Sequence, residues 1–83
     1  MIVSEQIRAA RAALKWTIDD LSFETNISVR TIKRIEAASG VPSANAQTLS
    51  AIRTALEAAG IEFIGTPTDR PGVRLRGREQ GLG

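Results

Sequence analysis

Residues 17–36 contain the pattern that most constrains the fold, namely two short helical segments joined by a tight turn. Thr17 is a typical helix N-cap, and Asp20 follows three residues later as a variant of the capping box. Asn26 is the non-glycine residue best suited to the left-handed backbone conformation that such a turn requires. Ser28 then provides the N-cap of a second helix. The spacing therefore predicts two short helices held together by the turn at Asn26.

The second of these helices has two chemically different sides. Ile32 and Ile35 fall on one side and form an apolar stripe. The opposite side carries Val29 and three basic residues, which are Arg30, Lys33 and Arg34. Basic side chains of these types can contact guanine edges and phosphates. Taken alone, three basic residues also fit an ordinary solvated helix face, so both interpretations stay open at this point.

A further helix is predicted before this pair. It is expected from about Glu5 to Lys15, with Ser4 as its N-cap. The side chains that recur at helical spacing along one of its faces are Ile7, Ala10, Arg11 and Leu14.

A fourth helix is predicted after the pair. Asn45 or Ser43 is expected to cap it, and Gly60 stands where a helix typically ends. Its apolar positions are Leu49, Ile52, Leu56 and Ala59.

Short alternating runs at residues 61–64 and 73–76 predict a β-hairpin after the fourth helix. The intervening residues 65–72 are rich in turn formers, so we expect a long loop between two short strands. The elements together predict a mainly α fold, with four helices in residues 1–60, a hairpin in residues 61–76 and a flexible tail in residues 77–83.

An isolated hairpin is only marginally stable in water, so this one must pack on the fourth helix or pair with a second chain. Val73 and Leu75 are expected to face inward, beside exposed arginines. We expect a homodimer formed through the fourth helix and the hairpin. The apolar residues predicted at this contact are Leu56, Ile61, Phe63, Val73 and Leu75.

The composition excludes several classes of function. The chain has no cysteine and no histidine, which removes thiol and imidazole chemistry and almost all zinc sites. Asp19 and Asp20 form a carboxylate pair, but they occupy a first helical turn, where the helix dipole favours them. No activated nucleophile and no phosphate-binding glycine loop is recognisable. We therefore expect no enzymatic activity, no metal and no cofactor.

The net charge of +2 is less informative than its distribution. Residues 1–63 hold seven basic and seven acidic side chains, so the whole excess lies in the C-terminal part. Binding to nucleic acid would have to rely on local clustering of charge. No apolar run approaches the ~20 residues of a membrane span, and the N-terminus lacks a signal-peptide pattern, so we expect a cytoplasmic protein.

Over residues 4–59 the chain resembles the lambda-repressor-like helix-turn-helix family, also called the xenobiotic-response-element type. The resemblance rests on the small residue Ser22, the turn at Asn26, the cap at Ser28, the two isoleucines of the second central helix and Glu36, all at the spacing of the family. It implies a helical domain that binds double-stranded DNA and regulates transcription. The hairpin in place of a fifth helix looks like a feature of small bacterial and phage-derived regulators.

In this family the second central helix enters the major groove, with its first turns against base edges. The resemblance implies base contacts by Val29, Arg30, Lys33 and Arg34. Arg34 is expected to make the best of them, a bidentate contact with guanine worth about 1–3 kcal/mol of discrimination. Phosphate contacts are expected from residues at or near helix N-termini, where ordinary capping is the alternative role; they are Thr17, Ser28, Thr31, Asn45 and Gln47.

Family members often pair an arginine of the first helix with the glutamate that ends the recognition helix. Arg11 and Glu36 occupy those positions here. Ile18 replaces a glutamine that contacts a phosphate in many members, and residues 37–47 carry no charge where relatives are often basic. These departures bear on the strength of DNA-backbone contact more than on the fold.

The leading functional prediction is a sequence-specific transcriptional regulator, a repressor acting as a homodimer on a two-fold-related DNA site. One module with few phosphate contacts would bind weakly, whereas two linked modules gain effective concentration. The alternative is a protein-binding module, such as an antitoxin or antiactivator, whose fourth helix and hairpin hold a protein partner. No sensor domain is recognisable, so no small-molecule ligand is expected. The resemblance implies a bacterial cytoplasmic protein that joins the nucleoid when bound.

Overall fold

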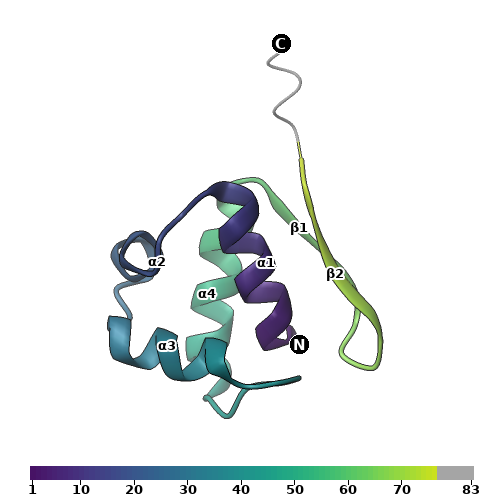
Figure 1. The fold of residues 1–83 in the computed structure, drawn as a ribbon, viewed down its shortest axis with the longest axis horizontal. Coiled ribbons are helices and arrows are strands. Elements are labelled where there is room, and N and C mark those ends of the chain that lie inside the picture. Colours follow the sequence, from purple (N-terminus) through teal and green to yellow (C-terminus); the bar gives the residue numbers. More distant parts are fainter. Residues whose placement is uncertain (77–83) are drawn as a thin grey trace.

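The computed structural model describes residues 1–76, so the flexible tail predicted for residues 77–83 lies outside the described residues. The elements are α1 (Ser4–Leu14), α2 (Ile18–Thr25), α3 (Val29–Ala37), α4 (Ala46–Ala58), β1 (Ile61–Thr66) and β2 (Asp69–Leu75). In Figure 1, α1 and α4 lie side by side at the centre, with α2 and α3 on one flank and the hairpin on the other. No helix among residues 1–76 combines the length and apolarity needed to cross a membrane.

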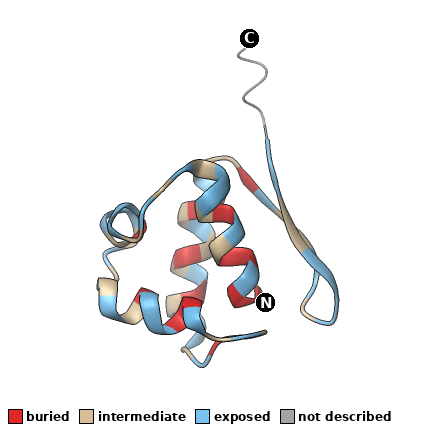
Figure 2. Cartoon of the chain, viewed as in Figure 1, coloured by how far each residue is buried: buried red, intermediate tan, exposed pale blue. Residues whose placement is uncertain are grey.

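The core lies where the four helices meet, and Figure 2 shows buried positions on all four. Each helix contributes at least one fully buried apolar side chain, namely Ile7 from α1, Leu21 from α2, Ile32 from α3 and Ile52 from α4. The predicted fold of four helices with a C-terminal hairpin is therefore confirmed.

Side-chain caps begin α2, α3 and α4, as the sequence predicts. The Oγ1 of Thr17 accepts a hydrogen bond from the Asp20 N–H, and the Asp20 carboxylate accepts one from the Thr17 N–H. The Oγ of Ser28 caps α3, and the Oδ1 of Asn45 caps α4. Asn26 has a φ of 60°, the left-handed conformation expected of the turn residue.

The predicted start of α1 is wrong. Val3, not Ser4, occupies the N-cap position, and the Val3 N–H donates to the Oε1 of Gln6. Ser4 is instead buried, and its Oγ donates to the Ile35 carbonyl oxygen at 2.7 Å. The Ser4 hydroxyl was expected to cap α1, but it forms its hydrogen bond with α3 instead. Lys15 follows the helix in the left-handed conformation.

The predicted long hairpin loop is also wrong, because the strands continue through most of the turn-forming residues. β1 runs to Thr66 and β2 begins at Asp69, with a bulge between Ile64 and Thr66. Gly65 has a φ of +77°, and a Cβ atom there would lie 2.1 Å from the carbonyl oxygen of Arg70. A glycine at this position lets the two strands approach closely enough to turn within two residues.

The hairpin is part of the same core as the helices. Ile61 is buried in the hydrophobic cluster, and β2 packs along α1 while β1 packs on α4. The buried side chain of Gln6 fastens both strands to α1, since its Nε2 donates to the carbonyl oxygens of Ile64 at 3.1 Å and Gly72 at 2.8 Å. The hairpin is thus anchored within one chain and does not depend on a second chain for support.

The predicted dimerisation residues differ in how far they are exposed. Leu56 is 0% exposed and Ile61 is 1% exposed, so neither side chain is available to a second chain in this conformation. Phe63 and Val73 are half-buried against the core. Leu75 was expected to face inward, yet it is 42% exposed. Of the five residues, Leu75 offers the clearest apolar contact surface.

Candidate nucleic-acid interface

Helix α3 separates its apolar and basic side chains onto opposite faces. Ile32 and Ile35 are buried in the core, whereas Arg30, Lys33 and Arg34 are exposed. Val29, in the first turn, is half-buried. The predicted base-contacting residues therefore lie outside the buried stripe of α3. Val29 and Arg30 are in its first turn, and Lys33 and Arg34 are one turn further on.

Arg34 is held by the loop that follows α3. Its guanidinium donates from Nη1 to the carbonyl oxygen of Ser43 at 2.7 Å, in the loop that leads to α4. A guanidinium has five donors, so this contact leaves others available to a base or a phosphate. Among residues 1–76, no hydrogen bond to the protein holds Arg30 or Lys33, and both side chains are exposed.

The predicted phosphate-contacting residues lie at helix N-termini, and four of them are exposed. Thr17, Ser28 and Asn45 cap α2, α3 and α4 respectively, and Gln47 is exposed in the first turn of α4. Thr31 is half-buried and accepts a hydrogen bond from the Ser28 hydroxyl at 3.0 Å. The capping role of Thr17, Ser28 and Asn45 is visible directly, and it is compatible with anion binding because helix N-termini carry partial positive charge.

Arg11 and Glu36 form the ion pair that the resemblance implies. The Arg11 Nε and Nη2 each lie 2.9 Å from one oxygen of the Glu36 carboxylate, and Nη1 donates to the Trp16 carbonyl oxygen at 3.0 Å. The hydrogen bonds to Glu36 raise the pKa of the Arg11 guanidinium above its ordinary value. The pair therefore links α1, the α1–α2 connection and the end of α3.

Two residues that hold α3 in place were not recognised in the sequence. Besides the Ser4 contact, the Arg8 guanidinium donates to the carbonyl oxygens of Glu36 and of Ala38, the latter at 3.2 Å. One signal was present: Ser4, Arg8 and Arg11 recur at i, i+4 and i+7, which places three polar side chains on one face of α1.

Glu5 anchors the loop that follows α3. Its Oε1 accepts a hydrogen bond from the Gly40 N–H at 3.1 Å, and the Ser4 N–H donates to the Gly40 carbonyl oxygen at 2.8 Å. The pKa of Glu5 is lowered, mainly by its own backbone N–H, then by the Gly40 N–H, with a smaller contribution from the charge of Arg8. The uncharged loop is therefore attached to α1 at Gly40 and to α3 at Ser43.

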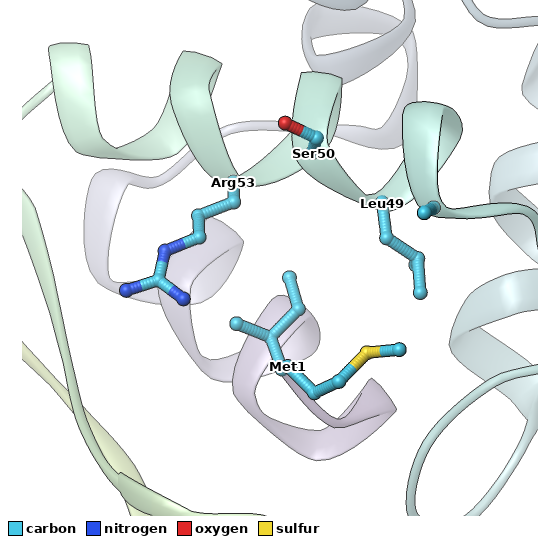
Figure 3. Close-up of a pocket in the computed structure, with 6 residues that line it drawn as sticks. Met1, Leu49, Ser50 and Arg53 are labelled. Atoms are coloured by element: carbon cyan, nitrogen blue, oxygen red, sulfur yellow. The ribbon is translucent and has the colours of Figure 1, made fainter.

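A pocket of about 230 Å³ lies between the N-terminus and α4. Figure 3 shows Met1 and Leu49 bordering it from opposite sides, with Arg53 and Ser50 on α4. Its volume lies below the range of roughly 300–1,000 Å³ that is typical of small-molecule sites. Its residues do not overlap with those predicted to contact DNA.

A family model described as helix-turn-helix matches residues 7–58, which include all four helices nearly in full. The chain belongs to this family, in its lambda-repressor-like type, and is a DNA-binding helix-turn-helix regulator. A search of curated protein sequences finds no match.

Proposed function

We propose that the chain is a dimeric transcriptional repressor that inserts α3 into the major groove of a two-fold-related DNA site. The observation that carries this proposal is the division of α3 into a buried apolar stripe and an exposed face with Arg30, Lys33 and Arg34. An α-helix fits the major groove, where base edges present distinct patterns of donors and acceptors. In this arrangement residues 1–60 read the DNA and residues 61–76 join two chains.

Arg30 is the strongest candidate for direct base recognition, with Val29 placed to contact a thymine methyl group. Arg34 can contact a base or a phosphate with the donors that its bond to Ser43 leaves available. Lys33 and Thr31 suit the phosphates on either side. Thr17, Ser28, Asn45 and Gln47 add phosphate contacts from helix N-termini.

The argument for dimerisation is DNA affinity. Stability of the hairpin gives no argument for it, because Gln6 already anchors the hairpin within one chain. The uncharged loop after α3 offers no cations to the DNA backbone, so one module neutralises few phosphates and binds weakly at physiological salt. Two joined modules would gain effective concentration. Leu75 is 42% exposed and lies in an edge strand, which presents backbone N–H and C=O groups to a second chain.

The test is selection of ligands from a random duplex library at about 0.15 M salt, near physiological ionic strength. Enrichment of a palindrome whose half-sites are about one helical turn apart would support a dimeric reader of DNA. Arg30→Ala should then relax the preference at one base pair and cost about 1–3 kcal/mol. Arg53→Ala, which removes a charge from α4, is the control. A library that shows no enrichment contradicts the proposal.

Repression has its own test. A reporter gene placed behind the selected sequence should be expressed less when the chain is produced, and Arg30→Ala should restore expression. A rise in expression would identify an activator instead.

The exposure of Leu75 also supports a second candidate function, a module that binds another protein, such as an antitoxin or antiactivator. The two functions can coexist in one chain. Arg30→Ala should weaken DNA binding and spare a protein partner, whereas Leu75→Glu should weaken the protein contact and leave the DNA-reading surface intact.

A further inference from the structure

The C-terminal end of α3 lacks the usual means of satisfying its own backbone. A helix leaves its last carbonyl groups without intrahelical partners, and a left-handed glycine commonly supplies the closing hydrogen bonds. Ala38 follows α3 in an extended conformation instead, with φ −76° and ψ 169°. The Ala38 N–H donates to the Ile35 carbonyl oxygen at 3.4 Å, and the carbonyl oxygens that follow need donors from elsewhere in the molecule.

Those donors come from one face of α1. The Ser4 hydroxyl donates to the carbonyl oxygen of Ile35, and the Arg8 guanidinium donates to those of Glu36 and Ala38. Arg8 also places a positive charge at the negative end of the α3 dipole. Helix α1 thus acts as a C-terminal cap for α3 across the tertiary structure.

We propose that Arg8 is a positioning residue for DNA reading, which sets the angle at which α3 presents its side chains to the major groove. This inference rests on the proposed function of α3. Arg30 and Glu36 are six residues apart, about 9 Å along the helix axis. A rotation of about 10° around the held end would move the first turn by about 1.6 Å at this rise per residue, more than a base contact tolerates.

Arg8 is better suited than Arg11 to reveal such a role. Arg11 pairs with a buried carboxylate, so its removal also threatens the fold. The Arg8 side chain is 42% exposed, and its bonds to α3 are to backbone carbonyl oxygens. Replacing it should release the end of α3 without stranding a buried charge.

The experiment compares Arg8→Met with Lys15→Met, which removes the same charge just beyond the C-terminal end of α1. The probes are the duplex enriched by selection and a scrambled duplex of equal length. Arg8→Met should lower the ratio of the two affinities about tenfold, the scale of one charge-assisted hydrogen bond, while Lys15→Met leaves the ratio unchanged. Arg8→Lys, which retains a donor and the charge, should recover part of the ratio. An unchanged ratio in Arg8→Met overturns the proposal.

Salt dependence separates positioning from direct contact. If Arg8 acts through α3, the slope of log affinity against log salt should match that of the unmodified chain. A slope smaller by about one would show that Arg8 itself binds a phosphate, and this result would overturn the positioning role.

A measurement without DNA separates failure of this inference from failure of the proposed function. Amide hydrogen exchange at residues 35–38 should be faster in Arg8→Met than in Lys15→Met, because the bonds from Arg8 to the carbonyl oxygens of Glu36 and Ala38 are lost. Equal exchange in the two variants contradicts the cap itself. If the unmodified chain selects no duplex but exchange is faster in Arg8→Met, the cap stands and the DNA-reading function fails.

Discussion

At the scale of single residues, two ion pairs with similar distances lie in different surroundings. Arg11 and Glu36 lie 2.9 Å apart with side chains 23% and 6% exposed, whereas Arg53 and Glu57 on α4 lie 3.0 Å apart with side chains 42% and 44% exposed. Removing one partner of a buried pair leaves an uncompensated charge, while exposed pairs contribute little. Burial, and not distance, should therefore decide how much each pair matters.

Arg11→Ala is expected to lower the free energy of unfolding by about 3 kcal/mol, because it strands the Glu36 carboxylate and frees the Trp16 carbonyl oxygen. Arg53→Ala is the matched control and should cost about 1 kcal/mol or less. Urea unfolding of the two variants measures both values. Equal losses would show that the Arg11 pair is not a structural anchor.

Glu5 predicts a specific pH dependence of stability. Its folded pKa is lowered, so its contribution is fully present above the ordinary glutamate pKa of 4.5 and is lost as the pH falls through the folded value. The difference in unfolding free energy between the unmodified chain and Glu5→Gln should therefore shrink from about pH 7 to about pH 3. Glu24→Gln on α2 is the control, because it shows how the loss of a carboxylate elsewhere in the chain changes the unfolding free energy. A difference that stays constant over this range contradicts the bond to Gly40.

At the scale of elements, the connections between helices and strands depend on residues with positive φ. Gly40, in the loop after α3, and Gly65, before the hairpin turn, have φ values of +72° and +77°. Their surroundings differ, because a Cβ at Gly40 would meet no atom within 4 Å, whereas at Gly65 it would clash with the backbone of Arg70. Substitution at Gly40 therefore tests backbone strain alone, whereas substitution at Gly65 tests strain together with a steric clash.

Gly40→Ala should cost about 1–2 kcal/mol, the penalty of a left-handed alanine. Gly65→Ala has the same penalty plus the clash, so it should cost more and should disturb the hairpin turn. Thermal unfolding gives the stabilities, and amide chemical shifts of residues 64–72 report the turn. Equal costs for both variants would mean that the bulge at Gly65 rearranges freely.

At the scale of the whole molecule, the surface available for a second chain is smaller than the sequence suggests. Leu56 and Ile61 belong to the core of one chain, and Gln6 anchors the hairpin internally. The proposed dimer would then use the exposed part of β2, where Leu75 supplies an apolar side chain. Such a contact would be modest in area and dependent on concentration.

Leu75→Glu should shift the chain toward the monomer in sedimentation at tens of micromolar, because it places a charge in the proposed contact. It should weaken binding to a palindromic duplex and leave binding to a single half-site unchanged. Thr68→Glu, which adds the same charge at the exposed hairpin turn, is the control. A chain that is monomeric with and without DNA before any substitution refutes the dimer.

The helices and caps were predictable because the interactions that form them are local. Thr17 with Asp20, Ser28 with Thr31, and the left-handed Asn26 each involve residues within three positions of one another. The predicted boundaries were wrong where tertiary contacts decide the structure. Ser4 bonds to α3, and at Gly65 the two strands approach so closely that any Cβ would clash. The basic face of α3 was also predictable, because helical spacing alone separates it from Ile32 and Ile35.

By itself, the sequence determined the helical class, the position of α3 and the chemical character of its exposed face, since periodicity and capping act over a few residues. The tertiary structure alone decided which polar residues of α1 hold the end of α3, and how the hairpin is fastened. Arg8 meets Glu36 across 28 positions, and Gln6 meets Gly72 across 66. No local pattern encodes such contacts, because they arise only when the buried faces of α1, α3 and the hairpin share one core.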